Sequence, residues 1–154
     1  MSDLYHKWLT TWGWGVVLFG LALAGIAWDA TSGFTRIFFD LVGSPIAEAP
    51  DTQMRFVIGL MGCVTAGWGL TFMAVFKAAA QLSPETARPI WGVTTAAALF
   101  WYGTDSAISI ALGYPLNAAS NTVLLALYLI PIWRSGVLRG KSTFSQSCKQ
   151  FNRS

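Results

Sequence analysis

The sequence predicts an all-α integral membrane protein, a four-helix bundle with a short interfacial amphipathic helix between the first two spans. Three observations predict this fold. Hydrophobic residues make up 54% of the 154 residues and charged residues only 11%, whereas a typical soluble domain carries about 25% charged residues. All charged residues except Asp105 fall outside four apolar runs of membrane-spanning length, and one long loop repeats apolar residues at helical spacing. This composition excludes a cytosolic enzyme, a nucleic-acid-binding protein and a disulfide-stapled secreted domain.

The four apolar runs are expected to form one domain over residues 1–133. A helix of about 21 residues is about 31 Å long, which matches the hydrocarbon core of a bilayer. Inside lipid the backbone must satisfy its own hydrogen bonds, so the runs are expected to be helical. The last run is the shortest and would suit a thin or locally adapted bilayer. The expected spans are about residues 8–28, 56–76, 90–112 and 117–133.

The connections between the spans differ in length. Residues 113–116 read Gly-Tyr-Pro-Leu, a tight turn that makes the last two spans an antiparallel hairpin. Before the third span, Pro84 and Pro89 suit a helix start, with Ser83 as a possible N-cap. The loop over residues 29–55 is long enough to need structure of its own.

Within that long loop, apolar residues at positions i, i+3, i+4, i+7 and i+8 predict one face of a short helix between Gly33 and Gly43. We expect this helix to lie flat on the non-cytoplasmic interface with its apolar face toward the lipid. The alternative is a docking helix for a partner protein. The residues of this face are Phe34, Ile37, Phe38, Leu41 and Val42.

The distribution of Lys and Arg predicts the orientation, because cytoplasmic loops are enriched in them. Of the ten Lys and Arg residues, only Arg36 and Arg55 fall on the side opposite the chain ends. Both termini are therefore expected to be cytoplasmic, and the basic tail over residues 134–154 favours an anionic lipid surface. Interfacial Trp residues are expected on the cytoplasmic side at Trp8, Trp12, Trp14, Trp91 and Trp133.

Asp105 is the one carboxylate inside an expected span, roughly 10 Å from the non-cytoplasmic interface. A charge at such depth is costly, which makes an intramembrane acid a hypothesis of a functional site. We expect hydrogen bonds from Ser109, Asn121 and Thr104, and Arg55 at the start of the second span is within expected reach. A structural role and a role in proton or cation coupling both remain open.

A polar group at the beginning of the fourth span accompanies this acid. Its residues are Asn117, Ser120, Asn121 and Thr122. They are expected to cap the helix and to join the hairpin, because polar side chains hydrogen-bond across membrane helices. The alternative is that they line a small polar vestibule together with Asp105.

Small residues every four positions along the second span predict a face on which helix backbones approach closely. They are Gly59, Cys63, Gly67 and Thr71. The face suits packing inside the bundle or contact between copies of the chain. The two cysteines, Cys63 and Cys148, are too few for a disulfide framework and are expected to be reduced.

The residues that catalysis or metal binding require are scarce. His6 is the only histidine and precedes the first span, so one chain cannot supply a bis-His haem pair. No cluster has the His, Cys or carboxylate spacing of a zinc site. We therefore expect no metal, no cofactor and no enzymatic activity.

Two stretches carry a resemblance to a known family. They begin Arg55-Phe56-Val57-Ile58-Gly59 and Asp105-Ser106-Ala107-Ile108-Ser109, and they end Ala66-Gly67-Trp68-Gly69 and Gly113-Tyr114-Pro115-Leu116-Asn117. They resemble an uncharacterised family of small four-span bacterial membrane proteins, over the second to fourth spans. The resemblance implies the fold and a bacterial inner membrane, but it assigns no activity. It singles out Arg55, Asp105 and Asn117 as the residues to inspect.

These observations lead to one main expectation of function and two alternatives. The main expectation is a non-catalytic accessory or scaffolding subunit of a larger membrane complex, respiratory or photosynthetic, with a protein partner or further copies of itself in the bilayer. The first alternative is a small oligomeric proton- or cation-coupled transporter that uses Asp105. The second is an enzyme of lipid or quinone chemistry, for which few reactive groups are present. Nucleic acid is not expected as a partner.

Overall fold

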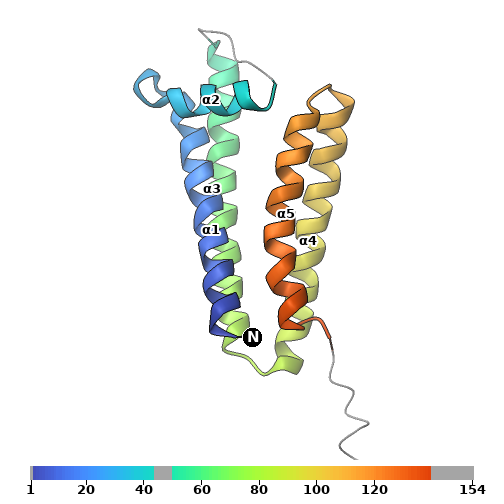
Figure 1. Cartoon of the computed structure of the whole chain (residues 1–154). Coiled ribbons are helices and arrows are strands. Elements are labelled where there is room, and N and C mark those ends of the chain that lie inside the picture. The colour runs from blue at the N-terminus through green and yellow to red at the C-terminus, as the bar shows by residue number, and fades with distance from the viewer. Residues whose placement is uncertain (1, 44–49, 140–154) are drawn as a thin grey trace, which may run out of the picture.

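The computed structural model describes residues 2–43 and 50–139, and all regular structure in these residues is helical. Four long helices run side by side, and a short helix lies across one end of them (Figure 1). The elements in order are α1 (Asp3–Ala24), η1 (Gly25–Ala27), η2 (Asp29–Thr31), α2 (Gly33–Leu41), α3 (Thr52–Ala80), α4 (Pro84–Ala111) and α5 (Pro115–Ser135).

Three of the long helices are long and apolar enough to cross a membrane: α1 with its η1 extension, α3 and α5. The remaining one, α4, is long enough at 28 residues but does not reach the same hydropathy. The chain is therefore an all-helical protein with three candidate membrane-spanning helices among its described residues. Residues 140–154, which hold most of the predicted basic tail and Cys148, lie outside the described part of the chain.

Each long helix begins before its predicted apolar run, because a helix continues into water where its caps allow, and α3 and α5 also end after their runs, whereas α1 and α4 end before the predicted residues 28 and 112. Helix α3 begins after Asp51, whose Oδ1 accepts a hydrogen bond from the Met54 backbone N–H at 2.7 Å. Helix α4 begins at Pro84 with Ser83 as its N-cap, as the sequence predicts. Pro89 lies inside α4 and does not start it.

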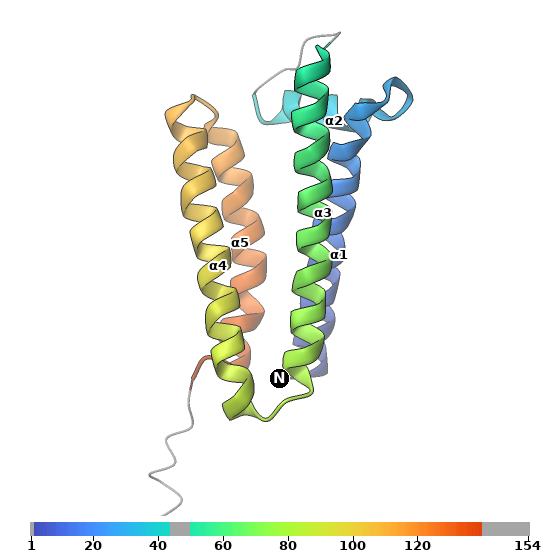
Figure 2. The ribbon, with the colours of Figure 1, turned by 180° about the vertical axis from the view of Figure 1, so that it is seen from behind.

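The four long helices form two hairpins. Helix α1 packs along α3 and α4 along α5, and Figures 1 and 2 show these two pairs from opposite sides. The N-terminus, the α3–α4 connection and the end of α5 lie at one end of the bundle (Figure 1). Helix α2 and the turn between α4 and α5 lie at the other end, called here the α2 end.

The α1 and α3 backbones touch through small residues. A Cβ added at Gly20 would stand 2.6 Å from the Gly62 carbonyl oxygen and 2.9 Å from the Ala66 Cα. A Cβ added at Gly62 would in turn stand 2.6 Å from the Gly20 carbonyl oxygen and 2.8 Å from the Ala24 Cα. No larger side chain fits between these turns, so the glycines fix the separation of the two helices.

The packing face of α3 differs from the predicted one. Of the predicted residues only Gly59 is buried, and Cys63, Gly67 and Thr71 are exposed. Spacing of four residues turns by about 40° per step around a helix of 3.6 residues per turn, so the predicted stripe leaves the interface. The observed stripe alternates steps of three and four and stays on one side: Gly59, Gly62, Ala66 and Gly69.

An aromatic core joins the two hairpins on the side away from α2. The Phe76 ring stacks on Trp91 from α4 and on Tyr128 from α5, with centroids 5.6 Å and 6.1 Å apart. The Tyr128 hydroxyl and the Thr95 hydroxyl share a buried hydrogen bond of 3.0 Å. Trp91, which the sequence places at the membrane interface, is instead 2% exposed in this core.

Two indole groups of α1 hold α5 by hydrogen bonds. Trp8 Nε1 donates to the Leu127 carbonyl oxygen at 2.9 Å, and Trp12 Nε1 donates to the Leu124 carbonyl oxygen at 3.0 Å. The Leu127 carbonyl lacks its helical donor because Pro131 stands four residues later and has no N–H. Trp8 replaces that donor, and this ties the hairpins together at the N-terminal end.

Helix α2 lies where the sequence predicts a short helix, but its apolar residues face in two directions. Phe38 packs edge-on against Phe19 of α1 at 4.8 Å, and Val42 is buried. Phe34, Ile37 and Leu41 are instead 49%, 60% and 72% exposed. Thr35, which is fully buried, donates a 2.9 Å hydrogen bond to the Ala22 carbonyl and so fixes α2 to the end of α1.

The close approach of α1 to α3 predicts a difference between two glycine variants. Alanine at Gly62 would push against α1 backbone, whereas a Cβ at Gly67 meets nothing within 4 Å. Both substitutions gain the same helix propensity, so their difference isolates packing. We expect Gly62→Ala to be less stable than Gly67→Ala by about 1–3 kcal/mol in denaturant titrations in mixed micelles. Equal stability of the two variants would contradict the observed packing.

Candidate functional site

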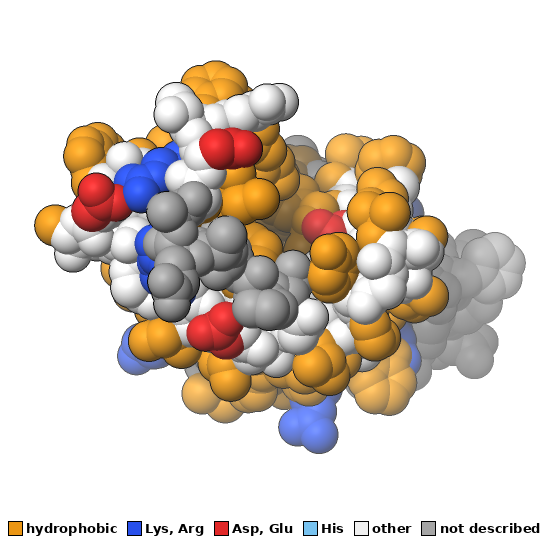
Figure 3. Space-filling model, turned by 90° about the horizontal axis from the view of Figure 1, so that it is seen from above, with side chains coloured by type: hydrophobic (Ala, Val, Ile, Leu, Met, Phe, Trp, Pro, Cys, Tyr) orange, Lys and Arg blue, Asp and Glu red, His pale blue; other side chains and the backbone are white. Residues whose placement is uncertain are grey.

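A cleft of about 500 Å³ lies between the two hairpins toward the α2 end. All four long helices and α2 contribute to its wall. Seen from the α2 end, hydrophobic side chains surround a hollow in which an acidic side chain is visible (Figure 3). The aromatic core and the indole hydrogen bonds join the hairpins mainly toward the other end, which leaves room for the cleft here.

One polar cluster interrupts the apolar wall of this cleft. The Asp105 Oδ1 atom accepts hydrogen bonds from Asn121 Nδ2 at 2.6 Å, from Asn117 Nδ2 at 3.0 Å and from Ser109 Oγ at 3.3 Å. Asn117 Nδ2 also donates to Ser109 Oγ at 2.8 Å. All four residues line the cleft, and Ser109 and Asn121 are buried.

The α4–α5 hairpin positions these four side chains. Asp105 and Ser109 stand one turn apart on α4, and Asn117 and Asn121 stand one turn apart on α5. The turn between the helices is tight because Gly113 adopts a φ of +85°, which favours glycine, and the Tyr114 N–H caps the Ser109 carbonyl at 2.7 Å. The short turn sets the two pairs at the same height, so both amides meet the carboxyl group.

The two carboxyl oxygens of Asp105 accept different numbers of hydrogen bonds. Oδ1 accepts all three hydrogen bonds, whereas Oδ2 has no hydrogen-bond partner within residues 2–43 and 50–139. The side-chain oxygens of Asn117 and Asn121 likewise accept no hydrogen bond from that part of the chain. The cluster therefore offers three acceptor oxygens that are still available to an occupant of the cleft.

The structure separates other residues that the sequence groups with Asp105. Thr122 shares a 3.0 Å hydrogen bond with the Tyr102 hydroxyl and donates to the Ala118 carbonyl. Thr104 donates to backbone carbonyls of its own helix. Neither hydroxyl forms a hydrogen bond with Asp105, because each donates to a backbone carbonyl of its own helix.

The expected reach of Arg55 to Asp105 is wrong. Arg55 forms an ion pair with Asp29 and donates from Nε to the Pro50 carbonyl oxygen at 3.2 Å. Arg55 belongs to the α1–α3 hairpin and Asp105 to the other hairpin, across the cleft. Asp29 follows α1 and η1, so Arg55 pairs with an acid of its own hairpin.

The aromatic wall of the cleft is a feature that sequence reasoning misses. Trp68 of α3 and Trp101 of α4 are two of its residues. In the structure their rings meet edge-on at 5.6 Å, joining α3 to α4, and both line the cleft. The only signal in the sequence is that every long helix carries Trp, Phe or Tyr, which locates no cleft until the inner faces are known.

No protein-family model, curated protein or solved structure matches this chain. The resemblance to a four-span bacterial family therefore stays an interpretation of two sequence stretches. The metal-ligating side chains are equally sparse: in the described ranges no three His, Cys, Asp or Glu residues gather. What the site can do chemically thus follows from the cleft and from the polar cluster alone.

The hydrogen bond between Asn121 and Asp105 predicts an energetic coupling that Thr122 lacks. A double-mutant cycle of Asp105→Ala with Asn121→Ala should give a coupling of about 0.5–1.5 kcal/mol, the range for hydrogen bonds between membrane helices. The matched cycle of Asp105→Ala with Thr122→Ala should give a value near zero. Unfolding in mixed micelles measures both, and equal couplings would contradict the assigned hydrogen bonds.

Proposed function

We propose that this chain is a non-catalytic accessory subunit of a membrane assembly and that it works by binding. Its cleft holds a small molecule that is mostly apolar and carries one polar group. The observation that supports this proposal is the cleft itself, with its volume of about 500 Å³ and a single polar cluster on its wall. Small-molecule sites typically enclose about 300–1,000 Å³ and combine apolar walls with a few placed polar groups.

We further propose that the chain crosses the membrane four times, with α4 as a spanning helix in addition to α1, α3 and α5. Between Arg88 and the end of α4 the only charged residue is Asp105, and its carboxyl group is hydrogen-bonded inside the hairpin. An acid that is paired and turned inward is the form in which a carboxyl group is tolerated at membrane depth. Helix α4 is also the partner of α5, one of the three helices apolar enough to span.

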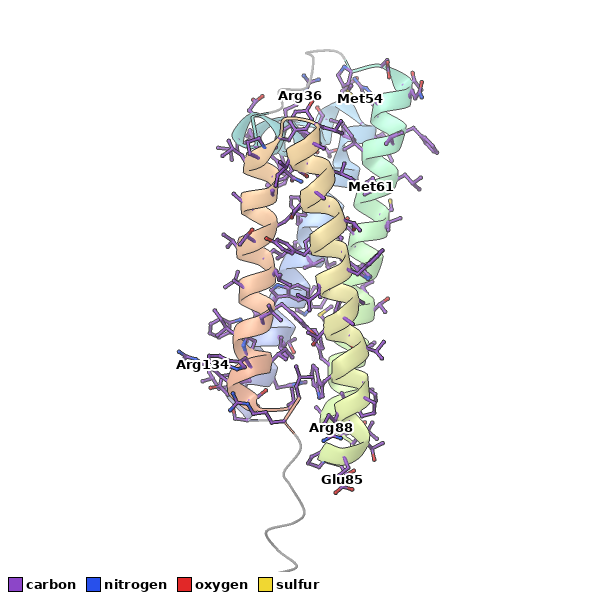
Figure 4. All side chains as sticks on the ribbon, turned by 90° about the vertical axis from the view of Figure 1, so that its right-hand side faces the viewer. Arg36, Met54, Met61, Glu85, Arg88 and Arg134 are labelled. Atoms are coloured by element: carbon purple, nitrogen blue, oxygen red, sulfur yellow. The ribbon has the colours of Figure 1, made fainter. Side chains whose placement is uncertain are left out.

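We further propose that both chain ends face the cytoplasm of a bacterial cell. Arg88 and Arg134 lie at the N-terminal end of the bundle and Arg36 at the α2 end, as Figure 4 shows. Of the seven Lys and Arg residues in the described ranges, five belong to the N-terminal end, since only Arg36 and Arg55 belong to the other. The positive-inside rule then assigns the N-terminal end to the cytoplasm and the mouth of the cleft to the opposite side.

A partner protein fits the exposed apolar side of α2. Phe34, Ile37 and Leu41 stand open at the α2 end beside Trp28. These side chains suit either the membrane interface or a protein that covers them. In the proposal the partner covers this side of α2 and receives the molecule that the cleft holds.

A second candidate function is cation-coupled transport. The unpaired Oδ2 of Asp105 in the cleft favours it, because a transported cation needs an acceptor that folding has not used. Purified chain in proteoliposomes would then show a cation or proton flux that Asp105→Asn abolishes. Absence of flux from wild-type protein would remove this candidate and leave the binding subunit.

A pair of neighbouring variants tests the binding function. Thr65 lines the cleft, whereas Val64 is exposed on the outside of the same helix. Phenylalanine at position 65 should fill the cleft, and phenylalanine at position 64 should face lipid. After mild-detergent purification from native membranes, mass spectrometry should find a small, mostly apolar molecule with the wild type and with Val64→Phe. The amount of this molecule should be at least tenfold lower with Thr65→Phe.

Two results would contradict the proposed function. One is a set of co-purifying small molecules that is the same for wild type and Thr65→Phe. The other is a wild-type chain that runs alone in native gels of mild-detergent extracts, with no protein at fixed stoichiometry, which would remove the accessory role.

A further inference from the structure

We infer that the occupant of the cleft is an amphiphilic cation, a primary ammonium group on a hydrocarbon body, and that Asp105 Oδ2 binds its nitrogen. The inference rests on the proposed function, because it names the chemical class of the molecule that the same cleft holds. It goes beyond that function by fixing the charge of the ligand and the atom that selects it.

The charge of the cleft favours a cation. Among the described residues that line it, Asp105 is the only Asp, Glu, Lys or Arg. Arg55, which the sequence predicts within reach of Asp105, is held by Asp29 and by the Pro50 carbonyl. A carboxylate on the cleft wall repels an anionic ligand and attracts a cationic one.

The hydrogen-bond pattern favours an ammonium group with several N–H donors. Asn117 already uses its two amide N–H groups on Asp105 Oδ1 and Ser109 Oγ, and Asn121 uses one of its two on Asp105 Oδ1. What remains on these three side chains is mainly acceptors, Asp105 Oδ2 and the two amide oxygens, and the second N–H of Asn121 is the one donor left without a partner in the described residues. A primary ammonium carries three donors and no acceptor, so it complements this set, and its hydrogen bond to a carboxylate is charge-assisted.

The rest of the wall favours an organic cation over an inorganic one. Hard metal cations take about six oxygen ligands, and one carboxyl group with two amides falls short of that number. Most lining residues are apolar or aromatic, such as Phe19, Phe38 and Leu124, and they suit a hydrocarbon body. Trp101 and Tyr114 also line the cleft, and the faces of such rings attract ammonium groups.

Three probes with the same alkyl chain and different head groups test the inference. The full chain is placed in nanodiscs of zwitterionic phosphatidylcholine and titrated with decylammonium, decanol or decyl sulfate by calorimetry, with empty nanodiscs subtracted. We expect decylammonium to bind one-to-one and at least tenfold more tightly than decanol, and we expect no saturable binding of decyl sulfate.

Two variants assign the selectivity to Asp105. Asp105→Asn keeps the shape of the side chain and removes its charge, so decylammonium should bind at least tenfold more weakly and no better than decanol. The matched control is Asp40→Asn, since Asp40 is exposed on α2 and does not line the cleft. That variant should bind all three probes like the wild type, and thermal unfolding should show that both variants are folded.

The outcomes separate the inference from the proposed function. Equal binding of decylammonium and decanol to the wild type, or tighter binding of decyl sulfate, would overturn the cationic ligand and leave the cleft as a binding site. If sodium or potassium chloride displaces decylammonium and a choline salt at the same ionic strength does not, the site binds an inorganic ion and the inference is overturned. If no probe binds saturably, or if Thr65→Phe leaves binding unchanged, the proposed function fails as well. If Asp105→Asn does not fold, the comparison of the three probes on the wild type decides.

Discussion

The close contact between the α1 and α3 backbones determines the shape of this protein. Gly20 and Gly62 leave no room for a side chain between the two helices, so that hairpin is narrow and rigid. In a bilayer, helices associate through van der Waals packing and hydrogen bonds and not through the hydrophobic effect. This contact joins α1 to α3 only, so different contacts hold the α4–α5 hairpin against the α1–α3 hairpin.

Most of the contacts between the hairpins lie toward the N-terminal end, and the Trp68–Trp101 ring pair on the cleft wall adds one more. The rings of Phe76, Trp91 and Tyr128 fill the space between the hairpins near the N-terminal end, and Trp8 and Trp12 add hydrogen bonds to α5 carbonyls. Toward the α2 end no comparable core joins the pairs, and the cleft occupies the space. Asp105 lies on the wall of this cleft, stabilised by neutral donors, and one of its oxygens remains available. The position of the acid is thus a consequence of how the two hairpins are joined.

The sequence predicts the parts of this structure that depend on local pattern. Apolar runs locate the long helices, the spacing of Phe34 to Val42 locates α2, and the short turn at Gly113 brings Asp105 and Ser109 to the height of Asn117 and Asn121. What depends on the rotation of one helix against another is not predicted. The packing stripe of α3 is displaced because a spacing of four drifts around the helix, and Arg55 is assigned to the wrong acid because its hairpin partner was unknown. The cleft could not be predicted, since it depends on where two hairpins fail to touch.

The most direct test of the account measures the charge selectivity of the cleft itself. In a chain with Cys63 and Cys148 replaced by alanine, Ser120→Cys places a thiol on the cleft wall, and Val123→Cys places one on the outside of the same helix. The account predicts that a cationic methanethiosulfonate modifies the thiol at position 120 at least tenfold faster than an anionic one of similar size. It also predicts that Asp105→Asn removes this preference and that position 123 never shows it. Equal rates with both reagents at position 120, or a preference that survives Asp105→Asn, would contradict a cleft whose occupant is selected by Asp105.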